Sequence, residues 1–310
     1  MTYDLQGAKT PLKTKIAVHW QYGAATHSGW QRTLNDDRSL LRMGLTSRGI
    51  PYAAAALADG MGGLADGGLA GDEAIDGLRS WLEEELPDLL ESKDRWGLLE
   101  ASIQRRFESI HCSISERALS QGMKQGTTLT VLLLFDSVYW IFHIGDCRVY
   151  KLSGRGGRQT RLARLTRDHT WVGRQVRLGL MAADTAGKHP KRNVLLRYLG
   201  MRGRARIDVR CGLYERQCLF LLTSDGLHGP LADGGVSRLI GENGGRVEDV
   251  QALCDALLSR TLEGTAPDNA SVLALRPTDP GKAGLRRFGA RLSIIVHRIR
   301  HPRLPWWLSG

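Results

Sequence analysis

Hydrophobic residues follow two different rhythms along this chain, and each rhythm predicts one kind of element. Three long segments, residues 70–90, 98–119 and 247–261, place apolar residues three and four positions apart, which indicates amphipathic helices. Short apolar runs bounded by Gly, Asp and Ser indicate strands, which we expect at residues 15–22, 52–58, 128–135, 138–144, 148–152, 205–209, 218–222 and 270–275. Strands, a pair of helices, more strands and a last helix favour an α+β sandwich over alternating βαβ units.

Two connections between these elements are informative. Only Asp136 and Ser137 separate two apolar runs, and this spacing predicts an antiparallel hairpin. Residues 170–192 are weakly patterned and mixed in charge, so we expect a surface flap with some helix.

The composition is that of an ordinary globular protein. With 310 residues, of which 42% are hydrophobic and 24% charged, the chain can bury a substantial core. No apolar run approaches the roughly 18 residues of a membrane-spanning helix, and the N-terminus shows no basic-then-apolar signal pattern. Five cysteines without Cys-x-x-Cys spacing are most simply reduced thiols, which predicts a cytoplasmic location.

The net charge of +11 is unevenly distributed. Residues 276–310 hold eight Lys or Arg and one acidic residue, which gives +7, and the remainder of the chain carries only +4. The high isoelectric point therefore mostly reports a basic tail. It is poor evidence for a body that binds nucleic acid, and nucleic acid is not expected as a partner.

Carboxylates recur at the ends of the predicted strands. Asp59 and Asp225 each follow an apolar run, and Asp268 precedes one. Placing such groups together is costly unless something positive holds them, and hard divalent cations prefer oxygen ligands. Gly60 lets a backbone carbonyl approach an ion, and Arg32 offers a planar fork suited to phosphate oxygens. This pattern predicts a metal-dependent hydrolase.

Eight motifs in order carry a family resemblance that extends from Gly23 to about Pro277. They are Thr26-x-x-Gly29-x-x-Arg32-x-x-Asn35-Asp36-Asp37, Ala58-Asp59-Gly60-Met61-Gly62-Gly63, Gly126-Thr127-Thr128, His143-Ile144-Gly145-Asp146-Cys147-Arg148-Val149-Tyr150, Leu165-Thr166-Arg167-Asp168-His169, Leu199-Gly200, Leu222-Thr223-Ser224-Asp225-Gly226-Leu227 and Pro267-Asp268-Asn269-Ala270-Ser271. With them the chain resembles the bacterial members of the metal-dependent PP2C (PPM) serine/threonine phosphatase family.

The resemblance implies a PP2C-like α-β-β-α sandwich with two Mn²⁺ or Mg²⁺ ions in a cleft at one end. By motif position, Asp59 bridges both ions, and Asp225 and Asp268 complete the shell of one. Asp37 and the Gly60 carbonyl serve the other, with Asp36 as a secondary candidate, and Arg32 binds the substrate phosphate. A metal-bridging water then attacks phosphorus in line, without a phosphoenzyme, and Arg32, Asp59 and Asp225 are the catalytic residues.

The chain departs from the family pattern at several positions. Asp36 stands where Glu or Gln is usual, and Met61 stands where many eukaryotic relatives have a histidine that is the proposed general acid. His228 is either a replacement for that acid or an incidental histidine of the cleft or surface. Asp146 matches one ligand of a third metal site, but its second ligand position is Gly229, so a third ion stays an open question.

The phosphatase domain is expected at residues 13–277, followed by a basic tail at 278–310. The tail places Phe288, Leu292, Ile295 and Ile299 on one face of an amphipathic helix. Three interpretations are open: a helix docked on the body, a docking element for a partner such as the cognate kinase, and a peripheral membrane contact. In the flap, Arg174, Arg177, Lys188, Lys191 and Arg192 suit either attraction of phosphopeptides or a simple solvated face.

These features predict a phosphoserine/phosphothreonine protein phosphatase whose partners are a phosphorylated protein and a bacterial Ser/Thr kinase system. Control of type VI secretion, in which one subgroup of stand-alone relatives acts, is compatible with the chain. Two alternatives are a phosphatase of anti-sigma-antagonist proteins, which usually carries a sensor domain, and a catalytically inactive scaffold that binds phosphoproteins. The scaffold is expected to lack one or more metal carboxylates, whereas this chain retains Asp37, Asp59, Asp225 and Asp268.

Overall fold

The computed structural model describes residues 2–3, 20–61, 67–154, 160–215, 218–242 and 247–278. In these residues the strands are β1 (Thr2–Tyr3), β2 (Trp20–His27), β3 (Asp37–Leu45), β4 (Pro51–Met61), β5 (Gly126–Thr127), β6 (Leu129–Phe135), β7 (Val138–Ile144), β8 (Arg148–Ser153), β9 (Arg161–Arg164), β10 (Asp208–Leu213), β11 (Leu219–Thr223) and β12 (Ala270–Pro277). The helices are α1 (Gly67–Glu84), α2 (Leu86–Glu91), α3 (Arg95–Gln121), α4 (Trp171–Arg177), α5 (Ala183–Ala186), α6 (Asp225–Glu242) and α7 (Val250–Leu262). Gly62, Gly63 and nearly all of the predicted tail lie outside the described residues.

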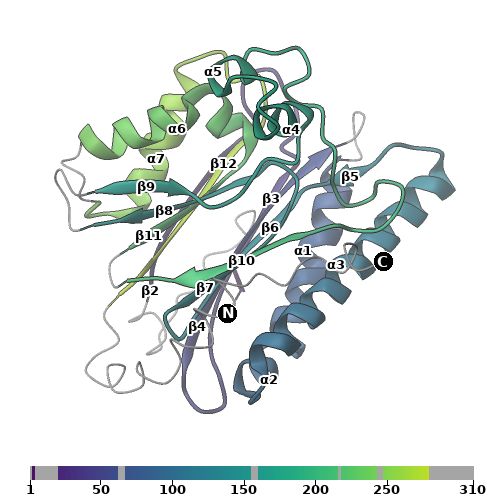
Figure 1. Ribbon diagram of the computed structural model, residues 1–310, viewed down its shortest axis with the longest axis vertical. Coiled ribbons are helices and arrows are strands. Elements are labelled where there is room, and N and C mark those ends of the chain that lie inside the picture. Colours follow the sequence, from purple (N-terminus) through teal and green to yellow (C-terminus); the bar gives the residue numbers. More distant parts are fainter. Residues whose placement is uncertain are drawn as a thin grey trace.

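Two antiparallel sheets pack face to face, and helices cover both outer faces (Figure 1). One sheet has the order β1-β3-β4-β6-β7-β10, with β5 paired to β4, and the other has the order β2-β12-β11-β8-β9. Helices α1 and α3 bury Trp81 and Phe107 against the first sheet, and α7 buries Leu257 against the second. The expected α-β-β-α sandwich is confirmed, with one apolar layer between the sheets and one beneath each helical layer.

The small residues of β4 explain its central place. Ala53, Ala55 and Leu57 face the layer between the sheets, whereas Ala54 and Ala56 face the helical layer. A strand buried on both faces reads as a continuous apolar run, and methyl side chains let the layers on either side approach closely. Strand β4 therefore lies deep in the molecule until it reaches Asp59.

The hairpin and the central strands appear where the pattern predicts them, but several other elements differ. Asp136 and Ser137 have φ of 52° and 65°, as a two-residue hairpin turn requires. The strand predicted at 15–22 corresponds to β2, which begins at Trp20 and extends to His27, and residues 15–19 lie outside the described residues. Gly23 in β2 lets α7 approach closely, since a Cβ there would lie 2.6 Å from the Val250 carbonyl oxygen. The predicted helix at 70–90 is two helices, and β10 begins at Asp208 rather than at 205.

Strand β3 and helix α6 have weak sequence signals and were missed. In β3, Arg38 and Arg42 interrupt the apolar pattern because they pair with the α1 residues Asp72 and Glu83. In α6, Pro230 and several glycines conceal a helix whose buried residues include Leu227 and Val236. In both cases tertiary contacts override the local pattern.

A polar network crosses between the two sheets at one end of the sandwich. The Asp37 carboxylate, at the start of β3, accepts hydrogen bonds from Ser224 Oγ at 2.8 Å and Ser271 Oγ at 2.6 Å. Ser271 lies in β12 of the other sheet, and Ser224 directly follows β11 of that sheet. The Asn35 amide donates to Thr26 Oγ1 at 2.8 Å, and Thr26 Oγ1 lies 2.7 Å from Ser271 Oγ. Strands β2, β3 and β12 and the end of β11 therefore meet at one buried carboxylate.

The flap, residues 170–192, leaves the body between β9 and β10 and carries α4 and α5 (Figure 1). Trp171 stacks on His189 with ring centroids 5.0 Å apart, and Lys191 Nζ lies 5.0 Å from the Trp171 ring centroid. Beyond the flap, Arg197 Nη1 contacts Asp208 Oδ1 at 2.9 Å, and His169 Nε2 lies 3.2 Å from Asp208 Oδ2. The two chain segments that flank the flap are thus fastened to the first residue of β10.

We predict that the double substitution Ser224→Ala/Ser271→Ala lowers the free energy of unfolding by about 2–4 kcal/mol, because it leaves the buried Asp37 carboxylate without its hydroxyl donors. Urea denaturation without added metal measures the change. Ser113→Ala on the exposed face of α3 is the control. A loss no larger than that of the control would show that the network does not hold the sheets together.

The Asp208 contacts predict a pH dependence of stability. Burial alone would raise the pKa of Asp208, but His169 and Arg197 hold it well below its ordinary value. A carboxylate whose pKa is lower in the folded than in the unfolded state stabilises the fold fully only above its unfolded pKa of about 4. This contribution is lost as the pH falls from there toward the folded pKa. Asp208→Asn should therefore show a shallower loss of stability between about pH 5 and pH 3 than the wild type, by urea denaturation at each pH. Equal slopes would contradict this, and exposed Asp94→Asn is the control.

Candidate functional site

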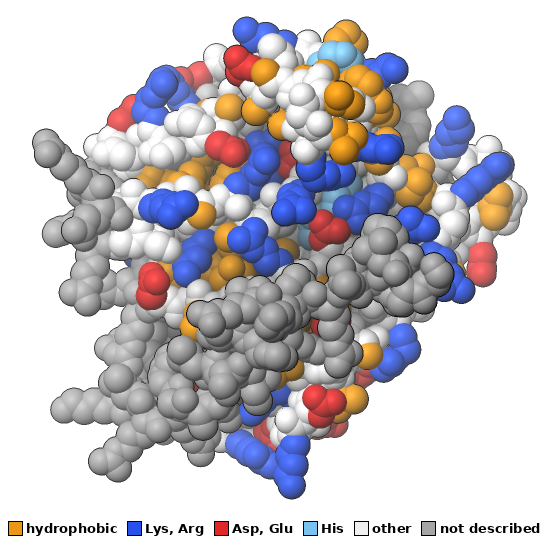
Figure 2. All heavy atoms as spheres, viewed as in Figure 1, with side chains coloured by type: hydrophobic (Ala, Val, Ile, Leu, Met, Phe, Trp, Pro, Cys, Tyr) orange, Lys and Arg blue, Asp and Glu red, His pale blue; other side chains and the backbone are white. Residues whose placement is uncertain are grey.

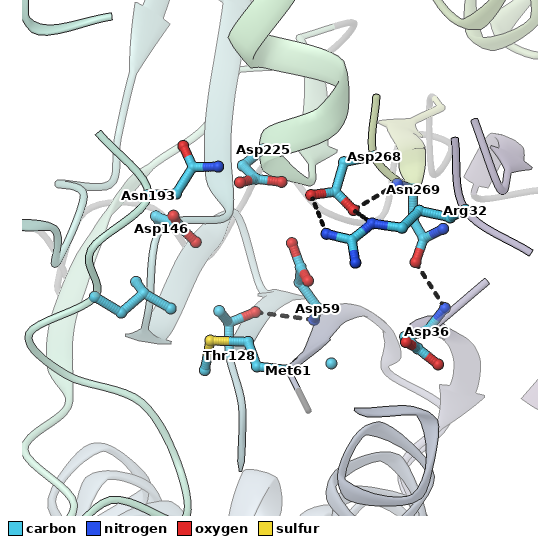
Figure 3. A pocket seen from close by; sticks show the side chains of 12 residues that line it. Arg32, Asp36, Asp59, Met61, Thr128, Asp146, Asn193, Asp225, Asp268 and Asn269 are labelled. Atoms are coloured by element: carbon cyan, nitrogen blue, oxygen red, sulfur yellow. Dashed lines mark hydrogen bonds and ion pairs between the residues drawn. The ribbon is translucent and has the colours of Figure 1, made fainter. Parts of the chain in front are cut away.

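Asp59 lies near the end of β4, where its backbone is held from the neighbouring strand. Its N–H donates to Thr128 Oγ1 at 2.9 Å, and its carbonyl oxygen accepts from Thr128 N at 2.9 Å and from Thr127 Oγ1 at 3.0 Å. With its backbone groups satisfied in this way, the Asp59 carboxylate points into a small cavity (Figure 3).

The cavity has a volume of about 220 Å³ and gathers carboxylates from five separate segments. Asp59 comes from β4, Asp146 from the turn between β7 and β8, and Asp225 from the start of α6. Asp268 comes from the loop before β12, and Asp36 immediately precedes β3 (Figure 3). The remaining lining residues are Arg32, Gly60, Met61, Thr128, Asn193, Leu195 and Asn269.

Close backbone packing brings Asp225 and Asp268 together. A Cβ at Gly226 would lie 2.0 Å from the Asn269 carbonyl oxygen, so any other residue there would push the two segments apart. Asn269 fixes its loop from the other side, since its amide donates to the carbonyls of Ser28 at 2.9 Å and Leu34 at 2.8 Å. The Asp-Gly and Asp-Asn pairs therefore position the two carboxylates as one unit.

The electrostatics of the cavity are unfavourable for carboxylates alone. Burial raises the pKa of Asp59 well above its ordinary value, and the negative charges of Asp37, Asp225 and Asp146 raise it further. Burial likewise raises the pKa of Asp146 and Asp225, with neighbouring carboxylates as the next cause. Clustered acids with raised pKa values are the pattern expected where a bound cation compensates the charge.

The residues fit hard divalent cations by the chemistry of the donor set. Carboxylates and a backbone carbonyl at Gly60 are oxygen ligands of the type that Mg²⁺ and Mn²⁺ prefer. Within the described residues, however, no three acidic, histidine or cysteine side chains are already grouped closely enough to hold one ion. The cavity therefore has the right kind of ligand atoms, but its side chains must change conformation before several of them can contact one ion.

The structure separates the two adjacent acids Asp36 and Asp37. Asp36 lines the cavity, and its N–H donates to Asn269 Oδ1 at 2.8 Å. Asp37 does not line it: the carboxylate is buried beneath, bound to Ser224 and Ser271, and its Oδ1 lacks a hydrogen-bond partner among the described residues. The cavity thus presents the residue that was the secondary candidate, and Asp37 supports the floor.

Arg32 lies at the rim, paired with Asp268. Its Nε is 3.0 Å from Asp268 Oδ1 and its Nη2 is 3.1 Å from Oδ2, so the guanidinium meets both carboxylate oxygens (Figure 3). The Arg32 side chain is 56% exposed. Among the described lining residues it is the only cation, which makes it the group able to attract an anion to this cavity.

Neither His228 nor the Gly229 position contributes a charge to the cavity. His228 is buried in α6 with Nδ1 3.1 Å from Thr223 Oγ1, and burial lowers its pKa well below the ordinary value, with the charge of Arg148 as the next cause. A neutral, buried imidazole does not suit the role of general acid. Gly229 lies along a larger neighbouring cavity and supplies no carboxylate beside Asp146.

Pattern reasoning missed two groups that line or shape the cavity. Asn269 accepts a hydrogen bond from the Asp36 backbone N–H. The Pro-Asp-Asn motif contains this residue, but only the aspartate of the motif was predicted to belong to the site. Asn193 reaches the cavity from the segment directly after the flap, and nothing in its local sequence marks it.

Sequence comparison finds relatives among bacterial phosphatases. The chain is 29% identical over 272 residues to the serine/threonine protein phosphatase PstP of Mycobacterium tuberculosis, an alignment that covers 86% of this chain and 46% of PstP. It is 35% identical over 173 residues to the serine/threonine phosphatase Stp of Listeria monocytogenes, which covers 55% of this chain and 65% of Stp. The chain thus spans about half the length of PstP and under two thirds of Stp. No protein-family model matches the chain.

Solved structures show the same relationship. The PstP structure from M. tuberculosis matches with a TM-score of 0.67 at 27% identity, over 84% of this chain and 100% of that one. The catalytic domain of PstP in complex with two manganese ions matches with 0.67 at 25% identity, over 84% and 99%. PppA, a regulatory component of the T6SS in Pseudomonas aeruginosa, matches with 0.63 at 25% identity, over 84% and 98%. By sequence and by fold, the chain is a relative of the bacterial PPM-type serine/threonine phosphatases and has their α-β-β-α sandwich.

Proposed function

We propose that this chain is a metal-dependent phosphatase that hydrolyses phosphoserine and phosphothreonine in proteins and so opposes a bacterial serine/threonine kinase. The observation that carries the proposal is the cavity in which five carboxylates lie beside Arg32. The names of the related proteins support it. We assign the activity to a domain at residues 13–277. We also propose a cytoplasmic location, which agrees with the five free cysteine thiols. None of the described helices is long and apolar enough to cross a membrane.

The metal ligands follow from which groups face the cavity. We assign Asp59 to both ions, Asp225 and Asp268 to one, and Asp36 with the Gly60 carbonyl to the other; Asp36 replaces Asp37 because Asp36 lines the cavity. Asp146 faces the same space and is the candidate ligand for a third ion. When bound, two Mn²⁺ or Mg²⁺ ions would supply Lewis-acid charge for the phosphoryl group and would lower the pKa of a water that serves as the nucleophile.

Arg32 is the residue that we assign to the substrate phosphate. Its guanidinium presents a planar fork of donors, which matches two phosphate oxygens as well as it matches the Asp268 carboxylate that it contacts in this structure. When Asp268 serves a cation instead, its negative charge is shared and the pair with Arg32 weakens. Metal loading would therefore release Arg32 for the phosphate group.

The biological setting is a further part of the proposal. The structural likeness to PppA, a regulatory component of the T6SS in Pseudomonas aeruginosa, supports a role in control of type VI secretion. The alternative of an inactive phosphoprotein-binding scaffold finds no support in the cavity, because every position that we assign to a metal ligand carries an oxygen donor.

The proposed chemistry depends on bound divalent ions, and hydrolysis assays test it. Hydrolysis of p-nitrophenyl phosphate and a phosphothreonine peptide should require Mn²⁺ or Mg²⁺ and cease with EDTA, and Asp225→Asn should lower kcat by about 100-fold or more because a metal carboxylate is lost. Exposed Asp94→Asn is the control. A wild-type protein that is inactive with every divalent ion would remove the enzyme proposal and leave the scaffold.

The roles of Asp36 and Asp37 can be distinguished without an activity assay. Mn²⁺ should raise the Tm of the wild type, because a ligand that binds the native state stabilises it. Asp36→Asn should remove most of that rise by deleting a ligand, whereas Asp37→Asn should keep most of it, because an amide oxygen can still accept from Ser224 and Ser271. The reverse order in thermal scans would return Asp37 to the metal shell.

A further inference from the structure

The positive charge of the folded body is concentrated in one stretch of sequence. Residues 160–215 contain 13 Lys or Arg and 4 Asp or Glu, a net charge of +9. The rest of residues 1–275 contains 22 basic and 27 acidic residues, a net charge of −5. Figure 2 shows Lys and Arg side chains gathered below the lobe of α4 and α5, in front of β9 and β10. The net positive charge of residues 1–275 therefore comes from the segment that contains the flap, and the rest of these residues is net negative.

Part of this basic segment forms one wall of a groove that joins the metal cavity. The groove has a volume of about 990 Å³ and lies between the flap and the first half of α6. Asp146, Asn193, Asp225 and Asp268 line both the groove and the smaller cavity, so the two spaces are continuous. A substrate peptide whose phosphate group binds at Arg32 could therefore extend along this groove.

The inner arginines of the groove are already paired. Arg148 Nη2 contacts Asp168 Oδ2 at 2.7 Å, and its Nη1 contacts Asp233 Oδ1 at 2.9 Å. Arg164 lies 3.8 Å from both of these carboxylates. These four groups form a compact network with little net charge, which shapes the groove but leaves no cation free for a ligand.

The outer arginines differ. Arg167, Arg177 and Arg192 line the groove and are exposed, and no carboxylate of the described residues lies within ion-pair distance of them. One exposed acid of the flap, Asp184, lines the same space and offsets one of the three charges. The lining holds five arginines and six aspartates in all, and it carries a net charge of +2 once Asp146, Asp225 and Asp268, which it shares with the metal cavity, are set aside. This positive part of the groove lies next to a cavity that would hold divalent ions.

We propose that this groove binds acidic residues that flank the phosphorylated residue, so that the substrates are phosphoprotein segments rich in Asp and Glu. The inference rests on the proposed phosphatase function. Charge complementarity favours an acidic peptide, and the concave shape with a narrow continuation to Arg32 favours an extended chain over a flat anionic surface. Arg167, Arg177 and Arg192 are the specificity-determining residues.

The experiment compares three phosphothreonine peptides of equal length, with acidic, neutral and basic flanking residues, at saturating Mn²⁺. The wild type should show a kcat/KM for the acidic peptide that is roughly tenfold that for the basic one, and the preference should shrink when salt is raised from about 0.05 to 0.5 M, because exposed charges are screened. Arg177→Ala/Arg192→Ala should reduce the acidic-to-neutral ratio by roughly fivefold.

Two further variants sharpen the result. Arg202→Ala/Arg204→Ala removes the same charge from exposed positions that do not line the groove, and should leave the ratio unchanged. Arg177→Glu/Arg192→Glu should invert the preference toward the basic peptide, an outcome that a loss of folding cannot produce.

The outcomes distinguish this inference from the function on which it rests. A wild type that hydrolyses p-nitrophenyl phosphate but shows no preference among the peptides overturns the inference alone. An equal fall in the ratio for the groove variant and the Arg202/Arg204 control overturns it as well, because the general positive field would then account for the preference. A wild type inactive on every substrate removes the proposed function and the inference with it.

Discussion

The hydrogen bonds of Asp37 to Ser224 and Ser271 join the two sheets directly beneath the metal cavity, and the rest of the site depends on them. Each anchor residue is a close chain neighbour of a cavity carboxylate: Asp37 follows Asp36, Ser224 precedes Asp225, and Ser271 lies three residues after Asp268. The spacing of the sheets at this end is therefore set by hydrogen bonds of defined length, rather than by apolar side chains that could slide. Fixing the anchor fixes where the cavity carboxylates can point.

This arrangement works against the stability of the metal-free protein. Burial and mutual repulsion raise the pKa of Asp59, Asp146 and Asp225, which means that the folded state opposes their ionisation. Large apolar layers on both faces of each sheet compensate for that cost, so the fold can hold the acids in place before a cation arrives. Binding of divalent ions to the native state then returns stability by mass action.

The fold and the site differ in how far the sequence predicts them. Apolar runs and the Asp-Ser turn are local signals, so the central strands and the hairpin were predictable. The sequence placed Asp59, Asp225 and Asp268 at strand ends, and the structure brings these three residues to one cavity. The choice between Asp36 and Asp37 was not predictable, because neighbouring residues of a strand point to opposite faces and the sequence does not state which face is buried. Strand β3 was hidden because its arginines pair with α1, a contact visible only in three dimensions.

The acidic metal cavity and the arginine-lined groove lie side by side and have opposite charge. The distance over which each one acts on a substrate decides which acts first. Those carboxylates of the cavity that are ionised would repel a phosphate group until cations neutralise them, whereas the arginines of the groove act on an acidic chain over roughly the 8 Å Debye length of physiological salt. A metal-free cavity would cancel much of that attraction at the place where the groove joins it, since Asp146, Asp225 and Asp268 line both spaces. Occupancy of the metal sites would therefore control the capture of an acidic substrate as well as the reaction itself. The same carboxylates would thus couple substrate binding to hydrolysis. A metal-free protein would bind its substrate only weakly, and no conformational change would be needed for this control.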